Sequence, residues 1–386
     1  FAIPLHLLCA IAGGIPLGWV FGFYAVLVAL GTFLYTASLL NVLFVAQVQY
    51  QAIVSSALAG WLGTNFVSFI LYYFSWDDSK FNGFGFKWFF WEDLANNYNL
   101  GFSWLFISLL VGSYWIWQGL NRQFKNPNGT LLSKAQSYGL VASVQIWILG
   151  FFYPVINQAN MEETLMPMML GISILTGVMF LLIIPAISPQ RKTLLDWARY
   201  AHEERRQGLK RPYSKWQDWI WGERSPSVVA IAINLGIVAI IWMPWILLWN
   251  GSFDATLKAG VALLMTLNLI WIYSAIAQSL YLIKFPKPGL LSMGMVMATL
   301  SLPPLAFGLF FKSVSVNTTL WMLFVFGSPW VALMQASTMA TFLSLLGQFA
   351  AIAALTLTLN HQIHRAGASH SKVLFAANQS KITPKV

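Results

Sequence analysis

The chain has 386 residues, of which 58% are hydrophobic and only 9% are charged, whereas about a quarter of the residues in a soluble domain are charged. This composition excludes a water-soluble globular protein, because a chain of this size cannot bury so much apolar surface and still cover itself with polar groups. The net charge of +10 does not indicate nucleic-acid binding, because the basic residues lie in a few loops between apolar blocks.

The apolar residues form blocks of about 20, the helix length that crosses a hydrocarbon core. We therefore predict an all-α, polytopic transmembrane helical bundle with about ten spans. In chain order the predicted spans cover residues 1–17, 19–46, 51–75, 101–121, 135–157, 165–188, 226–250, 257–284, 289–312 and 338–361. Two aromatic stretches, 86–94 and 320–334, are short or are broken by Gly327 and Pro329. We expect them to be interfacial or re-entrant pieces that do not span the bilayer.

The charged loops orient the predicted spans. Segment 189–225 carries nine Lys and Arg residues, and the loop after residue 121 and the tail after residue 361 are also basic. The intervening loops carry acidic residues instead: Asp77, Asp78, Glu92, Asp93, Glu162, Glu163 and Asp254. Strict alternation of the spans places every basic segment on one side, so the positive-inside rule predicts a multi-pass protein with a cytoplasmic C-terminus.

An internal repeat is visible in the chain. Gly22 and the run 35–37 (Tyr-Thr-Ala) recur about 240 residues later as Gly260 and the run 273–275 (Tyr-Ser-Ala). The same shift aligns blocks 19–46, 51–75 and 101–121 with blocks 257–284, 289–312 and 338–361 in the same orientation, which predicts two parallel transmembrane repeats.

The repeat divides the chain into three predicted parts. Residues 1–121 are the C-terminal part of a first repeat, residues 122–361 are a second repeat, and residues 362–386 are a basic cytoplasmic tail. Because the second repeat contains two more helices before the aligned region, we expect about 140–160 further residues upstream of Phe1.

Segment 189–225 combines an apolar stripe, formed by Leu194, Trp197, Ala198 and Ala201, with charged residues around it. One interpretation is a docking surface for a cytoplasmic partner. The other is an amphipathic hairpin that lies on anionic lipid and is anchored by its tryptophans. The composition favours neither.

The membrane interior is predicted to be uncharged, because no Asp, Glu, Lys or Arg lies centrally in any block, whereas ion pumps and proton relays usually need such groups. The sequence also lacks a phosphate-binding G-x-x-x-x-G-K-[ST] loop, a G-x-S-x-G or H-E-x-x-H motif and a Cys/His cluster. We therefore expect no enzyme activity and no metal or cofactor on this chain. The residues predicted to line a pathway are Asn234, Asn268 and Gln278.

The order of these features resembles the transmembrane part of ABC transporter permeases of the type-2 exporter class. In that family an elbow helix precedes six spans, a coupling helix lies between spans two and three, and a re-entrant hairpin lies between spans five and six. The resemblance maps these pieces to Asn121–Ser133, Pro189–Gln207 and Leu320–Met334. The chain departs from the family pattern in its longer coupling segment and in the fusion of both halves.

The resemblance implies a permease subunit that exports an amphiphilic or lipid-like substrate across a bacterial inner membrane. ATP and Mg²⁺ would bind to separate ATP-binding-cassette ATPase subunits, and the chain's other contacts would be with lipid. The residues expected to contact the ATPase are Asp196, Trp197, Arg199, Tyr200 and Glu203. The alternative function is a structural or assembly subunit of a larger membrane complex without transport. A membrane-embedded transferase is disfavoured by the absence of acid, base or metal-ligand groups at depth.

Overall fold

The computed structural model describes most of the chain as helix. The described residues are 8, 12–13, 17–44, 88–89, 98–126, 129–156, 161–189, 191–206, 215–223, 225–248, 253–282, 294–295, 298–299, 302–303, 305–306, 318–333 and 336–382. The regular elements among them are all α-helices, and they group into two compact units. Unit 1 contains Phe1–Pro127 and Gly150–Pro154, and unit 2 contains Asn128–Leu149 and Val155–Val386.

Among the described residues, seven helices are long and apolar enough to cross a membrane by length and composition, so the chain is a helical, multi-pass membrane protein. These stretches are Leu17–Leu39, Leu100–Lys125, Lys134–Tyr153, Met168–Ile187, Val228–Leu247, Phe253–Leu280 and Thr338–Ile363. They confirm seven of the predicted spans as helices. The predicted spans 1–17, 51–75 and 289–312 and the aromatic piece 86–94 lie wholly or largely outside the described residues.

In unit 1, helix α2 (Leu17–Phe44) packs along helix α4 (Tyr98–Lys125). A glycine on each helix allows the close approach: a Cβ atom on Gly22 would lie 2.7 Å from Phe102 Cδ2, and one on Gly112 would lie 3.0 Å from Phe33 Cε2. Small residues at such crossings let helix backbones approach closely in membranes.

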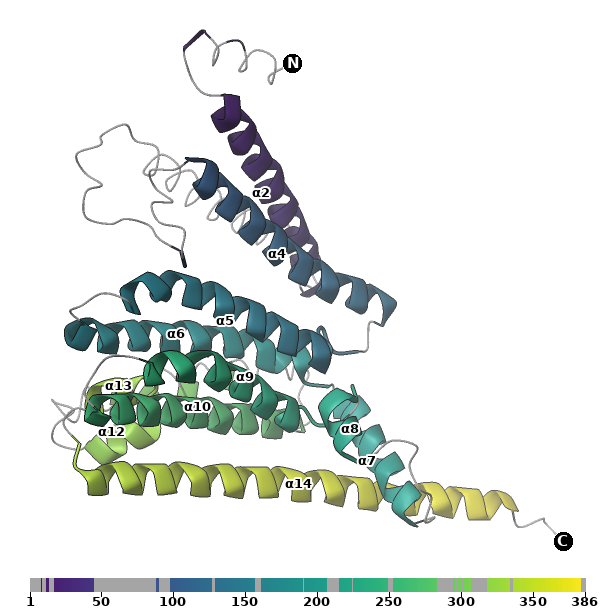
Figure 1. The fold of residues 1–386 in the computed structure, drawn as a ribbon. Helices are drawn as coiled ribbons and strands as arrows, with labels where there is room; N and C mark the ends of the chain where they lie inside the picture. Colours follow the sequence, from purple (N-terminus) through teal and green to yellow (C-terminus); the bar gives the residue numbers. More distant parts are fainter. Residues whose placement is uncertain are drawn as a thin grey trace. The chain divides into compact units, whose positions relative to one another are not determined.

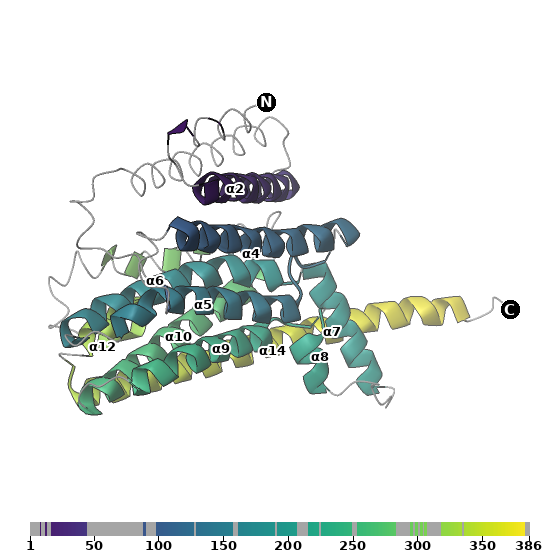
Figure 2. The ribbon, with the colours of Figure 1, turned by 45° about the horizontal axis from the view of Figure 1, so that its top comes forward.

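Unit 2 is built around helix α10 (Phe253–Tyr281), which contacts α6 (Met161–Ile187), α9 (Val228–Leu247) and α14 (Thr338–Ile382). These helices and α5 (Lys134–Ile156) run side by side in Figures 1 and 2. The helices α7 (Arg191–Arg206) and α8 (Lys215–Trp221) lie at one end of the group.

Helices α12 (Thr318–Phe324) and α13 (Ser328–Ala332) form a broken pair that contacts α10. The break lies at Gly327, whose φ of 81° is left-handed and favours glycine. Pro329 lies within the first turn of α13, where its missing N–H leaves no hydrogen bond unmade. The predicted interruption of 320–334 at Gly327 and Pro329 is confirmed.

One expectation about a helix is wrong. No separate elbow helix covers Asn121–Ser133, because α4 continues to Lys125 and the described residues 129–133 are not helical. The helix of the predicted span 338–361 also continues beyond residue 361, because α14 runs for 45 residues to Ile382. At 1.5 Å per residue α14 is about 67 Å long, more than twice the hydrocarbon thickness of about 30 Å. Its second half therefore extends well beyond the span that ends at Ile363.

Candidate functional site

The candidate site is the connection between α6 and α9, residues 189–227, which we call the connecting segment. It leaves α6 at Ser188, whose Oγ donates to Ile184 O at 2.6 Å, and continues through Pro189 into α7. Pro189 lies two residues after the end of α6 and two residues before the start of α7, a position where proline is common because it cannot continue the preceding helix. The helix expected over Pro189–Gln207 is observed as α7.

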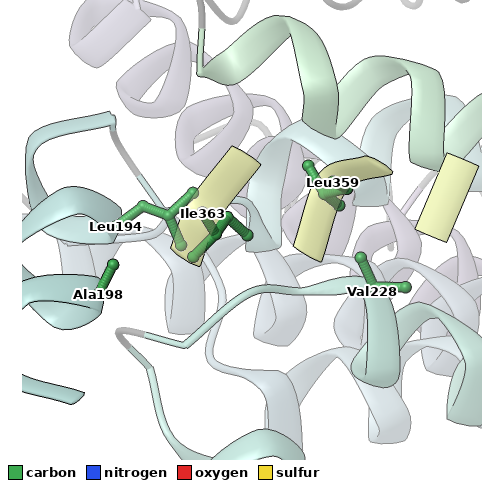
Figure 3. Close-up of a cluster of buried hydrophobic side chains, with 5 residues drawn as sticks. All are labelled: Leu194, Ala198, Val228, Leu359 and Ile363. Carbon is green, nitrogen blue, oxygen red and sulfur yellow. The ribbon is translucent and has the colours of Figure 1, made fainter. Parts of the chain in front are cut away.

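The apolar stripe of α7 is covered by other helices of unit 2. Leu194 and Ala198 are 5% and 6% exposed, and they form one buried cluster with Val228 of α9 and with Leu359 and Ile363 of α14. Figure 3 shows Ile363 beside Leu194 and Ala198. Because this cluster occupies the stripe, α7 packs on protein through its apolar side.

The opposite side of α7 carries charges of alternating sign. Lys192 is exposed, and Arg199 Nη1 donates to Asp196 Oδ1 at 2.9 Å, with side-chain exposures of 29% and 41%. These three residues are spaced i, i+4 and i+7, so they lie along one face of α7 and their charges read plus, minus, plus. We call this face, with Lys192, Asp196 and Arg199, the charged face.

The five residues expected to contact a partner fall into three groups. Asp196 and Arg199 lie together on the charged face. Trp197 instead packs, partly buried, against the apolar cluster of Leu194 and Ile363, so it supports the helix from within. The side chains of Tyr200 and Glu203 lie outside the described residues.

Both ends of the connecting segment bind spanning helices. At the start, Arg191 Nε donates to Leu282 O, just after α10, at 2.8 Å. At the end, Lys134 of α5 donates to Trp219 O, Ser225 Oγ and Pro226 O at 2.7, 2.6 and 3.1 Å. Lys134 lies at the end of the basic loop after residue 121, whose charges indicated only the orientation of the chain, so its contact with the connecting segment was missed from sequence. The signal that marks its place is the capping box formed by Ser133 and Gln136, which starts α5.

The three predicted pathway residues are buried between helices. Gln278 of α10 donates to Ser227 Oγ at 2.5 Å, and Asn234 of α9 donates to Ser137 Oγ of α5 at 2.9 Å. Asn268 is 5% exposed, and its Nδ2 has no hydrogen-bond partner among the described residues. Interhelical hydrogen bonds of this kind join spans within the bilayer, so Gln278 and Asn234 connect α9 to its neighbours.

A second polar set joins α5, α6 and α9. Gln145 donates to Thr176 Oγ1 at 3.1 Å and accepts from Trp242 Nε1 at 2.6 Å. All three side chains are buried, and the two bonds use both the donor and the acceptor of the Gln145 amide.

The broken pair α12–α13 is bound to three spans. Trp330 Nε1 donates to Ser173 Oγ of α6 at 2.6 Å, Tyr273 of α10 donates to Phe324 O at 3.2 Å, and Gln348 of α14 donates to Met322 O at 3.0 Å. The bonds to Phe324 and Met322 occupy carbonyls near the end of a short helix, which lack partners within that helix.

Comparison with known proteins adds no assignment, since no family model matches the chain and neither the curated proteins nor the solved structures contain a significant match. Within the part of the chain that the structure describes, no group of three or more His, Cys, Asp or Glu residues is arranged to hold a metal ion. The connecting segment is therefore the feature from which we infer function.

Proposed function

We propose that the chain is the membrane-spanning permease subunit of an ATP-driven transporter of the type-2 ABC exporter kind. In this proposal the charged face of α7 receives a separate ATP-binding-cassette ATPase on the cytoplasmic side of a bacterial inner membrane. ATP binding by that partner moves the connecting segment, and the spans move with it.

The observation that carries the proposal is the packing of α7. An amphipathic helix that lies on a bilayer uses its apolar face to enter the lipid. Here that face packs against Ile363 and Leu359 of α14 and Val228 of α9, so it is not available to lipid. On the side away from this cluster, α7 carries the charged face, in which Lys192 is exposed and Asp196 and Arg199 are partly exposed. Alternating charges suit a protein partner with a complementary pattern, because such patterns fix register and suppress wrong partners.

The two units support the proposed duplication. Helix α2 (17–44) and helix α10 (253–281) begin and end about 240 residues apart, and α4 and α14 begin at residues 98 and 338, about the same distance apart. In unit 1, α2 packs on α4, and in unit 2, α10 packs on α14. This correspondence favours two parallel repeats and about ten spans in all, with the blocks outside the described residues completing the set.

The buried polar side chains favour an amphiphilic or lipid-like substrate. Among residues whose burial is described, the buried polar side chains of the spans are Ser, Thr, Asn and Gln, with Lys134 at the very start of α5 as the one charged exception. An interior that offers hydrogen bonds but no central charge suits a solute with a polar head and an apolar body more than a bare ion. Asn234, Asn268 and Gln278 are the side chains proposed to meet it.

A charge exchange on α7 tests the partner contact. The single variant Asp196→Arg breaks the Arg199 pair and reverses one charge. The double variant Asp196→Arg with Arg199→Asp restores an ion pair within α7 but inverts the pattern that a partner meets. We expect both variants to lose co-purification with an ATPase and ATP-driven substrate transport in proteoliposomes.

The matched control exchanges Asp254 and Lys258, which form another ion pair within one helix, at 2.6 Å, and lie near the start of α10. This exchange should leave both activities unchanged. If the double variant on α7 behaves like the wild type, the charged face does not bind the ATPase. If the wild type stably joins a membrane complex that hydrolyses no ATP, the chain is a structural or assembly subunit instead.

A further inference from the structure

We propose that Lys134, assisted by Tyr138, is a positioning residue that makes the end of the connecting segment move together with α5. The proposal rests on the function proposed above and adds the route by which movement of α7 and α8 reaches the spans. The contact of Lys134 with Trp219, Ser225 and Pro226 is called the Lys134 contact below.

The ammonium group of Lys134 is buried at the start of α5. Lys134 is 2% exposed, whereas lysine is almost never fully buried unless it is paired. Its ammonium group donates to Trp219 O, Ser225 Oγ and Pro226 O, and a lysine ammonium can donate three hydrogen bonds. Because each bond involves a charged donor, together they hold the turn between α8 and α9 more strongly than neutral hydrogen bonds would.

Two of the hydrogen-bond acceptors, the carbonyl oxygens of Trp219 and Ile220, lie at the end of α8. Trp219 and Ile220 belong to the last turn of this seven-residue helix, where carbonyl groups lack partners within the helix. Lys134 binds Trp219 O, and Tyr138 donates to Ile220 O at 2.8 Å. Positive charge at a helix C-terminus also interacts favourably with the helix dipole. Residues of α5 thus cap α8 from outside.

Hydrogen bonds hold the start of α5 in place. The capping box of Ser133 and Gln136 has bonds of 2.9 and 3.1 Å, and Leu132 N donates to Ala186 O, near the end of α6, at 3.0 Å. The turn that Lys134 binds leads directly to Ser227, the residue that accepts from Gln278 of α10. A displacement of α8 is therefore passed to α5 and to the start of α9 at the same time.

The test uses Lys134→Met in the full chain, in lipid nanodiscs and in complex with its ATPase subunit. Methionine keeps the length of the side chain but removes the charge and all three donors. The control is Lys258→Met, which alters a partly exposed lysine of α10. We expect the backbone amides of residues 219–223, 225 and 227 to exchange hydrogen about 10- to 100-fold faster in Lys134→Met, since hydrogen bonds to a charged group are lost, and to be unchanged in the control.

A second readout separates positioning from simple stability. Spin labels are placed at Gln217 of α8 and Ile146 of α5, both exposed, in a background in which Cys9, the one cysteine of the chain, is replaced by alanine. When Lys134 is present, the distance between the labels should be the same with and without ATP, because α8 and α5 move together. In Lys134→Met that distance should change with ATP, and the number of substrate molecules transported per ATP should fall while ATPase binding persists.

Unchanged amide exchange in Lys134→Met, or a label distance and transport ratio equal to those of the wild type, would overturn the proposal. If Lys134→Met does not reach the membrane, Tyr138→Phe decides, with faster exchange expected at residues 220–221 and unchanged exchange refuting it. If no ATPase joins the chain, the function proposed above fails, and the exchange measurement alone still decides whether Lys134 fixes the turn.

Discussion

Replacing Ile363 by alanine should release α7 from α14. Ile363 is 5% exposed and contacts the buried stripe of α7 at Leu194 and Ala198 (Figure 3). Truncating a buried isoleucine to alanine costs about 2–5 kcal/mol. At about 3 kcal/mol, the population of the locally opened α7 rises by about 100-fold. Amide hydrogen exchange of residues 191–206 in nanodiscs measures this directly, because exchange of these amides follows the local opening of the helix.

The control for this prediction is Leu357→Ala on the same helix. Leu357 is 68% exposed, so its truncation removes no contact with α7 and should leave the exchange of α7 unchanged. Leu194→Ala combined with Ile363→Ala should cost less than the sum of the two single changes, since both side chains belong to one cluster. Equal exchange in Ile363→Ala and Leu357→Ala would refute the packing argument.

Two further changes test the bundle. Gly327→Ala should lower the free energy of unfolding in detergent by about 1–2 kcal/mol, because φ of 81° is unfavourable for alanine and its Cβ would lie 2.8 Å from Leu170 Cδ1. The control is Gly171→Ala, where the added Cβ has open space around it. This change should be neutral or should stabilise the protein by up to about 1 kcal/mol. Gln145→Leu should destabilise by about 1–2 kcal/mol in the same assay, because it removes the bond to Trp242 and its second interhelical bond; a variant as stable as the wild type would show that these bonds contribute nothing.

The spans were predictable because a bilayer imposes a length and a composition on each of them. The break in α12–α13 was predictable because Gly327 and Pro329 have conformational preferences that act locally. The length of α14 was not predictable from hydropathy, because the apolar signal stops near Ile363 while the helix continues. Helix α14 packs against α7, a contact distant in sequence that a hydropathy pattern does not report.

The candidate site could also be predicted only in part from the sequence. Periodicity indicated that α7 has an apolar stripe and a charged face, but it does not tell whether lipid or protein covers the stripe. The structure supplies that answer through Leu359 and Ile363, which lie about 165 residues from Leu194. Lys134 was missed because a basic residue between two apolar blocks has the same sequence signature whether it marks topology or binds a neighbouring turn.

The most direct test of the central claim is a photo-activatable cross-linking residue at position 192 of α7, introduced in native membranes. Lys192 is exposed on the charged face, so the account predicts a cross-link to a subunit that carries an ATP-binding cassette, and no such cross-link from a matched probe at Phe253, which is 83% exposed at the start of α10. Cross-links from position 192 to lipid alone, or to a protein without ATPase activity, would contradict the account.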